Sequence, residues 1–334
     1  MASEILESLG GETGCGRLAR AFYARVARDA ALKPLFPGRS MRCAIEEFTS
    51  FLVQFLDGGE DEMQHRRWLS LLESHRRFQI GPAERQAWLR HMRTTLEEAA
   101  IDDGARAGLR QFFESTSLYI TGRPGNSVEH GELGARWREQ RALDDLAAAV
   151  DAGRDEAAIS AAARFETRPS VFVGVLARMV RTGRDELLRF TLEAIRRRPA
   201  LAGHRYAGST LLHWASGAGC VAVTAALLEL GMDADLAGRG GHTPLYNVAN
   251  ECGAPSGPLV VERLVRAGAD VNRRSDATRA TPLHAAARRG HVAIARALLD
   301  SGADPRARDS KGATPLDRAR NCRQKEMVAF LAAR

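Results

Sequence analysis

Cysteine is scarce in this chain of 334 residues, and its spacing matches no common kind of cross-link. The number of cysteines is odd, they lie far apart, and no Cys-x-x-Cys pair occurs; they are Cys15, Cys43, Cys220, Cys252 and Cys322. This arrangement argues against a disulfide framework and against a zinc site. We therefore expect the five thiols to be small buried apolar side chains in a reducing compartment.

Long hydrophobic runs are missing as well. The longest uncharged apolar stretch, Val221–Leu228, is far shorter than the roughly 20 residues that a membrane-spanning helix needs. The first 16 residues have no basic start followed by an apolar segment, so we expect no secretory signal. Both absences lead us to expect a cytoplasmic protein without a membrane partner.

Two further absences restrict the fold and the chemistry. No strand-like alternation of apolar and polar residues is visible, so we expect an all-α fold. No Gly-x-Gly-x-x-Gly element or other reductase module occurs, so any redox chemistry here would need an external electron source. An enzymatic activity is therefore left open rather than predicted.

The net positive charge is carried by the second part of the chain. Residues 1–125 hold 17 of the 48 Lys and Arg residues and 17 of the 41 Asp and Glu residues, so the remainder carries the whole excess of +7. Aromatic residues are not interleaved with the arginines and no nucleic-acid motif occurs, which disfavours a nucleic-acid partner.

An internal repeat is the clearest feature that is present. Four tetrapeptides recur at successive offsets of 33, 38 and 33 residues: Thr210-Leu211-Leu212-His213, Thr243-Pro244-Leu245-Tyr246, Thr281-Pro282-Leu283-His284 and Thr314-Pro315-Leu316-Asp317. Pro after Thr suits the first turn of a helix, where a missing N–H costs nothing. Three turns with Gly then Asp, at Gly231, Gly268 and Gly302, allow the second helix of a unit to end in a left-handed conformation.

These residues resemble the ankyrin repeat, and the unit Thr281–Asp304 matches it best. The resemblance implies a solenoid that docks a protein partner through its repeat tips and inner helices. Exposed arginines there would favour an acidic partner, or would simply form a solvated basic face; the candidates are Arg273, Arg274, Arg288, Arg289 and Arg308. Upstream, Leu143–Phe165 and Val171–Ile195 are interpreted as helix pairs with turns at Gly153 and Gly183, and as degenerate or capping repeats.

The domain boundaries follow from these patterns. We predict a helical domain over 1–122, a Gly-rich linker over 123–136, and a repeat domain over 137–334. Within the repeat domain, 137–205 hold the degenerate repeats and 206–334 the clearer ones. The last helix, around Met327–Leu331, is predicted to be the C-terminal cap.

The first domain shows helical periodicity throughout. Leu18, Phe22 and Val26 share one helical face, and Pro82 is placed to open a later helix. Three segments stand out from a plain helical bundle: Phe22-Tyr23, the stretch Leu71–Gly81 around His75, and the stretch Glu84–Met92 around Trp88. On its own, His75 beside Arg76 and Arg77 indicates a solvated surface side chain, and the aromatic residues indicate core packing.

Together, however, these segments resemble the truncated haemoglobins, in particular the group with Trp on the helix after the iron ligand. The resemblance runs from Gly10-Gly11 to about Thr121, and its most specific part joins His75 to Phe78, Ile80-Gly81 and Ala87-Trp88-Leu89. It implies a helical-sandwich globin fold followed by the ankyrin solenoid. It also implies haem b as cofactor, with His75 as the iron ligand.

The resemblance further implies which residues surround the haem. Tyr23 and Trp88 hold the distal hydrogen-bonding positions, and Ala44 stands where many globins carry a distal histidine. The expected cofactor-binding set is Tyr23, Phe36, Ala44, Phe48, Phe51, Leu52, His75, Arg76, Phe78, Ile80 and Trp88. Ser74 stands where the family usually has an arginine for a haem propionate, and Arg76 or Arg77 is expected to replace that arginine.

Several functions remain open at this stage. The chain is expected to bind oxygen or another diatomic gas reversibly, with the ankyrin part docking a partner. Alternatives are a gas or redox sensor that signals through the ankyrin part, haem-dependent detoxification of nitric oxide or peroxide, and a scaffold that has lost its haem.

Overall fold

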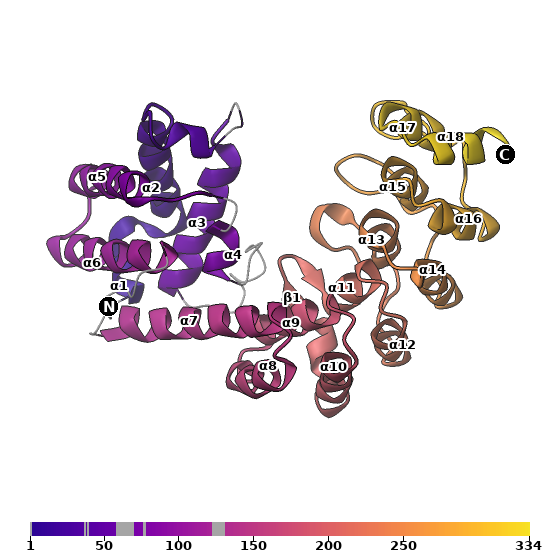
Figure 1. Cartoon of the computed structure of the whole chain (residues 1–334), viewed down its shortest axis with the longest axis horizontal. Coiled ribbons are helices and arrows are strands. Elements are labelled where there is room, and N and C mark those ends of the chain that lie inside the picture. The colour runs from indigo at the N-terminus through magenta and orange to yellow at the C-terminus, as the bar shows by residue number, and fades with distance from the viewer. Residues whose placement is uncertain (1, 37, 39, 58–69, 76–77, 122–130) are drawn as a thin grey trace. The chain divides into compact units, whose positions relative to one another are not determined.

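The computed structural model describes residues 2–36, 38, 40–57, 70–75, 78–121 and 131–334. In these ranges it contains 18 α-helices and a single hairpin of two-residue strands, which confirms the all-α fold class. The chain divides into two compact units, Met1–Ala149 and Val150–Arg334 (Figure 1). Each unit is described separately below.

The first unit packs helix on helix around an aromatic core. Its helices are α1 (Ala2–Leu9), α2 (Gly11–Val26), α3 (Arg42–Asp57), α4 (Leu71–His75), α5 (Pro82–Glu98), α6 (Asp103–Ile120) and α7 (Gly131–Asp151), with a 3-10 turn at Lys33–Leu35. Helix α2 packs against both α3 and α5, and α5 packs against α6. This arrangement fits the helical sandwich expected from the sequence.

The predicted apolar faces form this core. Leu18, Phe22 and Val26 of α2 are buried together, as their helical spacing indicated. Helix α5 begins at Pro82, as predicted, and the Glu84 carboxylate accepts a hydrogen bond from the Gly81 N–H at 2.9 Å. That contact pairs one of the backbone donors left over at a helix start.

Helix α7 extends the first unit beyond the predicted boundary at residue 122. Leu133 and Trp137 are 3% and 4% exposed and belong to the core of this unit. The Arg136 guanidinium donates to the carbonyls of Phe55 and Asp57 at 2.8 and 3.1 Å, at the C-terminal end of α3. Residues 131–149 therefore fold with the first unit, whereas the sequence assigned them to the linker and to the repeats.

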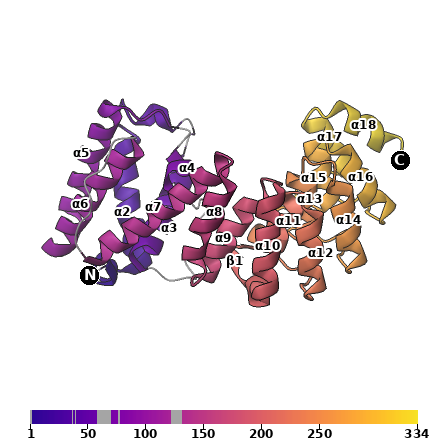
Figure 2. The same ribbon diagram turned by 60° about the horizontal axis from the view of Figure 1, so that its bottom comes forward.

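The second unit is a stack of helix pairs in two rows, seen in Figures 1 and 2. One row is α9 (Pro169–Val180), α11 (Leu211–Gly217), α13 (Pro244–Glu251), α15 (Pro282–Arg289) and α17 (Pro315–Asn321). The other is α8 (Asp155–Ala162), α10 (Asp185–Arg197), α12 (Val221–Glu229), α14 (Gly257–Arg266), α16 (Val292–Asp300) and α18 (Lys325–Ala332). Successive helices contact each other along each row, so one continuous core runs through the stack.

Turn chemistry agrees with the sequence analysis. Gly153 and Gly183 have φ of +72° and +70° at the turns before α8 and α10. Gly231, Gly268 and Gly302, at the ends of α12, α14 and α16, have φ of +81°, +95° and +92°, which side chains with a Cβ rarely adopt. The hairpin of β1 (Arg205–Tyr206) and β2 (Ser209–Thr210) was not predicted, because two-residue strands are too short to show alternation.

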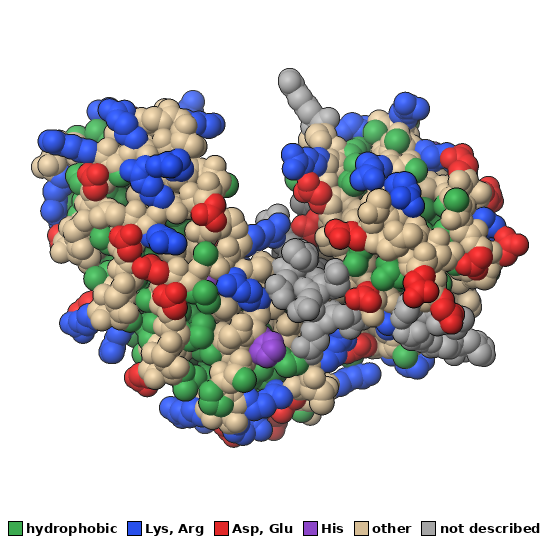
Figure 3. All heavy atoms as spheres, turned by 180° about the vertical axis from the view of Figure 1, so that it is seen from behind, with side chains coloured by type: hydrophobic (Ala, Val, Ile, Leu, Met, Phe, Trp, Pro, Cys, Tyr) green, Lys and Arg blue, Asp and Glu red, His purple; other side chains and the backbone are tan. Residues whose placement is uncertain are grey.

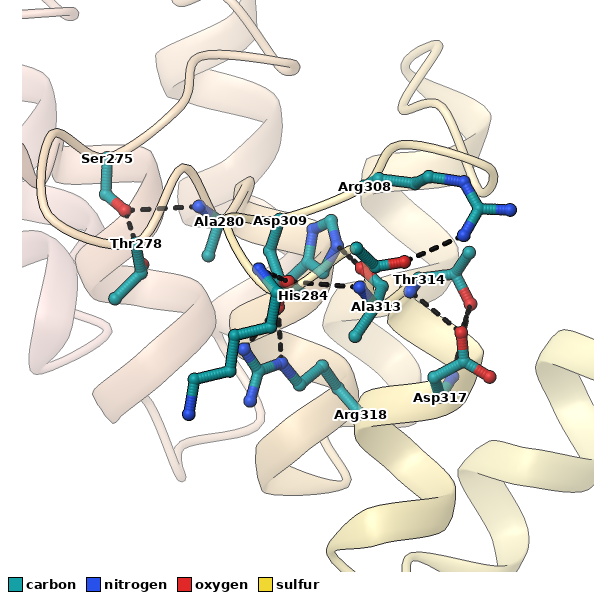
Figure 4. Close-up of polar contacts among 12 residues, drawn as sticks. Ser275, Thr278, Ala280, His284, Arg308, Asp309, Ala313, Thr314, Asp317 and Arg318 are labelled. Atoms are coloured by element: carbon teal, nitrogen blue, oxygen red, sulfur yellow. Dashed lines mark hydrogen bonds and ion pairs between the residues drawn. The ribbon is translucent and has the colours of Figure 1, made fainter.

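The repeat motif ties each unit of the stack to the next. The Thr281 hydroxyl donates to His284 Nδ1 at 2.8 Å, and His284 Nε2–H donates to the Ala313 carbonyl of the following repeat at 3.0 Å (Figure 4). Asp309 accepts from the backbone N–H of Ala313 at 3.1 Å and is ion-paired with Arg318. The Thr and His of the tetrapeptide thus start a helix and also join neighbouring repeats.

The expectation that all cysteines are buried is wrong for two of them. Cys15, Cys220 and Cys252 are buried, whereas Cys43 and Cys322 are exposed because each lies on an outward face near a helix end. All five are free thiols. Within the described ranges, no helix is both long enough and apolar enough to cross a membrane.

Candidate functional site

The site is built around His75, the last residue of the short helix α4. Its Nδ1 lies 2.9 Å from the Leu71 carbonyl oxygen one turn earlier. A carbonyl oxygen only accepts hydrogen bonds, so Nδ1 carries the proton of the neutral ring. In that tautomer Nε2 has the lone pair with which an imidazole binds a metal.

Ser74 gives this ring a second contact. Its Oγ lies 2.9 Å from His75 Nδ1 and donates to the same Leu71 carbonyl at 2.7 Å. The hydroxyl oxygen therefore shares the Nδ1 proton with that carbonyl. Two acceptors around one N–H hold the tautomer and the orientation of the imidazole.

Aromatic rings connect His75 to helices far away in the sequence. Phe78 lies 6.2 Å from the His75 ring, and Phe36 lies 5.3 Å from Phe78, measured between ring centroids. Tyr23 continues this line at 5.7 Å from Phe36 and 6.1 Å from Phe48. The structure therefore brings together five predicted site residues from α2, α3, α4 and the segments beside them.

Trp88 reaches the same group through a shared neighbour. The Phe22 ring lies 5.1 Å from Tyr23 and 5.0 Å from Trp88, edge to face with both. Trp88 also lies 5.5 Å from Phe113 of α6. Tyr23 on α2 and Trp88 on α5 thus both contact the ring of one buried phenylalanine.

Burial distinguishes these residues from the ordinary core. Phe22, Phe112 and Phe113 are at most 3% exposed. Most of the predicted site residues are only half-buried, although they lie among apolar neighbours; these are Tyr23, Phe36, Phe48, Phe51, His75, Phe78, Ile80 and Trp88. Large apolar side chains that keep accessible surface beside an imidazole are suited to hold a flat apolar cofactor.

The remaining predicted residues have different positions. Ala44 is half-buried in the first turn of α3, and Leu52, on the same helix, is fully buried in the core. Phe51 stacks on Phe55 at 5.5 Å. Arg76, predicted to contact a haem propionate, lies outside the described residues, as does Arg77.

Sequence reasoning missed a polar contact behind α4. The Leu71 N–H donates to the buried carboxylate of Asp144 on α7 at 2.7 Å. The available signal was the spacing of Trp137, Gln140 and Asp144, which share one helical face and are all buried. An acidic residue in a charged helix is normally interpreted as surface, which concealed this signal.

A second histidine of the unit has a different environment. His91 Nε2 lies 2.7 Å from Asp29 Oδ2, and this hydrogen bond is the main cause that lowers the pKa of Asp29. Among the described residues, no three His, Cys, Asp or Glu side chains cluster in a way that would hold a metal ion. A single imidazole with an aromatic surround is therefore the arrangement to explain.

The predicted basic residues of the second unit are all exposed; they are Arg273, Arg274, Arg288, Arg289 and Arg308. They form two groups. Arg274 donates to the Arg308 carbonyl at 3.2 Å between two repeat loops. Arg288 and Arg289, at the end of α15, both donate to the Asn250 side-chain oxygen.

Comparison with protein families gives one match in each of the two structural units. Residues 4–121 match the family described as bacterial-like globin, and residues 250–334 match ankyrin repeats in three copies. The first match covers every predicted haem-site residue and ends before α7. The second begins inside α13, so it contains the motifs at Thr281 and Thr314 and not the motif at Thr243.

Two relatives support the globin match, and a third relative is of a different kind. The chain is 30% identical over 121 residues to Group 2 truncated hemoglobin 3-1 of Lotus japonicus, covering 35% of this chain and 71% of that protein. It is 26% identical over 131 residues to Two-on-two hemoglobin-3 of Arabidopsis thaliana, covering 38% of this chain and 73% of that protein. It is 43% identical over 72 residues to Potassium channel KOR2 of Oryza sativa subsp. japonica, but these are 22% of this chain and only 10% of the channel.

Proposed function

The chain belongs to the truncated haemoglobin family through residues 4–121 and carries ankyrin repeats at 250–334, and on this basis we propose that it binds oxygen or another diatomic gas on haem b and docks an acidic protein partner. The observation that carries the gas-binding part is the contact between His75 Nδ1 and the Leu71 carbonyl inside a surround of half-buried aromatic rings.

The residues present fit a haem. A histidine that binds haem iron donates its other ring N–H to a carbonyl or a similar acceptor, and His75 has this arrangement. Phe36, Phe78 and Phe48 supply apolar surface beside it. Ser74 does not offer the positive charge that a propionate favours, so we assign that role to Arg76 or Arg77.

Haem supplies the iron atom to which a diatomic gas binds. The chain supplies the surroundings: His75 holds the group from one side, and Tyr23 and Trp88 each offer a hydrogen-bond donor, a phenol O–H and an indole N–H. Such donors favour a polar ligand such as oxygen over carbon monoxide. Ala44 offers no donor, so hydrogen bonding depends on the other two residues.

The visible spectrum of the purified full-length protein tests this proposal. We expect a Soret band after addition of haem and a five-coordinate ferrous spectrum. His75→Ala should abolish that spectrum, whereas the control His91→Gln should keep it, because His91 pairs with Asp29 on another part of the unit. Absence of haem binding by the unmodified protein, or an unchanged spectrum of His75→Ala, would overturn the proposal.

Exposed arginines support the acidic character of the partner. Figure 3 shows Lys and Arg side chains over the visible face of the second unit, with acidic side chains between them. The Arg274 guanidinium donates to the backbone carbonyl of Arg308, so the charge of Arg274 lies beside the loop that carries Arg308. A positive surface raises the association rate with an acidic partner and is screened by salt.

A polyglutamate peptide is a suitable probe for this surface. We expect the full-length protein to bind it at low ionic strength and to lose most of the affinity in the double variant Arg274→Ser, Arg308→Ser. The double variant Arg196→Ser, Arg197→Ser at the exposed end of α10 is the matched control. Equal losses of affinity in both variants would show that only the overall charge matters and would contradict a specific role of this surface in binding the partner.

The cytoplasmic location expected from the sequence is also part of this proposal. The five free thiols, two of them exposed, are consistent with a reducing compartment.

A further inference from the structure

A buried carboxylate on α7 is directed at the helix that carries His75. Asp144 is 1% exposed, and its Oδ1 accepts from the Leu71 N–H at 2.7 Å and from Gln140 Nε2 at 3.1 Å. Tyr119, on α6, lies close to this carboxylate: burial, followed by the charges of Asp144 and Asp145, raises the pKa of Tyr119 well above its usual value. Residues of three elements therefore meet at Asp144.

Burial of a carboxylate is costly unless several donors surround it. One of the donors here is the first backbone N–H of α4, where the partial positive charge of the helix start favours an anion. Ser70, just before the helix, accepts from the Glu73 N–H at 3.1 Å and leaves the Leu71 N–H to Asp144. The carboxylate therefore completes the start of this one short helix.

Leu71 connects that contact to the iron ligand. Its N–H binds Asp144, and its carbonyl accepts from both His75 Nδ1 and the Ser74 hydroxyl. The Leu71 carbonyl belongs to the peptide unit that directly follows this N–H. Because a five-residue helix has only one turn, few other hydrogen bonds within the helix fix the position of that carbonyl. The position of the Leu71 carbonyl, and with it the orientation of the imidazole, thus depends on Asp144.

We propose that Asp144 is a positioning residue for His75, which it orients through the two backbone groups of Leu71. The inference rests on the proposed haem function, but it lies outside the globin family match, which ends at residue 121. It gives α7 a role in orienting the His75 imidazole towards the haem iron.

Two substitutions at Asp144 and one at its neighbour test this inference in the full-length protein. Asp144→Ala removes the acceptor, and Asp144→Asn keeps an oxygen acceptor but removes the charge. Asp145→Asn is the matched control, because Asp145 is exposed on the next position of the same helix. Helical circular dichroism of all three variants should equal that of the unmodified protein.

The first measurement needs no haem. In the haem-free protein we expect amide hydrogen exchange of Leu71 to be at least about tenfold faster in Asp144→Ala, since a charge-assisted hydrogen bond is lost, and partly restored in Asp144→Asn. Exchange in Asp145→Asn should be unchanged. Equal exchange of the Leu71 amide in Asp144→Ala and in the unmodified protein would overturn the inference, whatever the haem content.

The second measurement reads the imidazole directly. In the ferrous protein we expect the iron–histidine stretching frequency to shift in Asp144→Ala, and haem loss to be roughly tenfold faster, with Asp144→Asn between the two. If the unmodified protein takes up haem through His75 and neither quantity changes, this inference fails while the proposed function stands. If the unmodified protein takes up no haem, the proposed function fails, and the exchange measurement still decides whether Asp144 holds α4.

Discussion

At the scale of single residues, the distinctive feature is Ser74, which stands where the resemblance to truncated haemoglobins leads us to expect an arginine. Its hydroxyl lies between His75 Nδ1 and the Leu71 carbonyl, at 2.9 and 2.7 Å. On the proposed haem function, a short polar side chain here gives up a charged contact with a haem propionate and contacts the histidine instead. We therefore expect the site to hold His75 firmly and to bind the haem less tightly.

Removal of that hydroxyl gives a first prediction. In Ser74→Ala the Leu71 carbonyl still accepts from His75 Nδ1, so the histidine should remain the iron ligand. Loss of one of two acceptors should cost about 1 kcal/mol, or roughly fivefold in haem affinity. A haem-transfer assay to an acceptor globin measures this change, and a loss as complete as that of His75→Ala would contradict it.

The distal donors give a second prediction at this scale. Tyr23→Phe and Trp88→Phe each remove one polar hydrogen from half-buried side chains that contact the same Phe22 ring. We expect each change to speed oxygen dissociation by roughly tenfold, as loss of about 1–1.5 kcal/mol implies. Stopped-flow kinetics measures the rates, with Tyr246→Phe in the second unit as control. Unchanged rates in both variants would exclude a distal donor role.

At the scale of elements, the buried histidine of the first clear repeat makes the solenoid sensitive to acid. His213 is fully buried on α11, and its Nε2 lies 2.9 Å from the Leu236 carbonyl. Burial lowers the pKa of His213 to about 4; the charge of Arg205 acts in the same direction, and the hydrogen bond to the Leu236 carbonyl opposes it. Burial likewise lowers the pKa of His242 and of His284.

The sign of the pH dependence follows from this direction. Between the usual histidine pKa near 6.5 and the folded value, the unfolded chain binds the extra proton and the folded one does not. Stability is thus fully present above about pH 6.5 and decreases as the pH falls towards 4, by roughly 3 kcal/mol for His213. Thermal unfolding of the full chain at pH 7.5 and 4.5 should show this loss, and His213→Gln should reduce it. Identical pH profiles of the two proteins would contradict the prediction.

The sequence predicted the elements whose signals are local. Thr before Pro located the starts of α13, α15 and α17, and glycine located the turns after α12, α14 and α16. Pro82 located the start of α5. These signals act through a few neighbouring residues, so one sequence is sufficient to identify them.

The contacts that depend on distant elements could not be predicted in this way. Asp144 lies 73 positions after Leu71, and nothing in the composition of α7 shows that its carboxylate is buried. The site residues were found by family resemblance, whereas their common location depends on the packing of α2, α3 and α5. Periodicity alone predicted the helices but not which faces meet.

At the scale of the whole molecule, the boundary between the two units falls within the residues of one helix. Helix α7 runs from Gly131 to Asp151, while the first unit ends at Ala149. Val150 and Asp151 belong to the second unit, where Arg184 donates to the Val150 carbonyl and Arg178 pairs with Asp151 at 2.8 Å. The predicted linker, residues 123–136, therefore ends in a helix that begins at Gly131, which the Gly-rich composition of Thr121–Gly134 concealed.

Two fragments test where the globin unit ends. A fragment of residues 1–151 retains Leu133 and Trp137 of α7 in the core and Arg136 on the last carbonyls of α3, whereas residues 1–122 lack all three. Burial of two such apolar side chains contributes roughly 1.5–3 kcal/mol each, so the shorter fragment should melt at least about 10 °C lower. It should also hold haem less tightly, because it lacks the Asp144 contact to α4. Calorimetry measures the melting temperatures of both fragments, and haem titration measures their haem affinities. Equal melting temperatures would mean that the globin fold is complete at residue 122 and that α7 does not stabilise it.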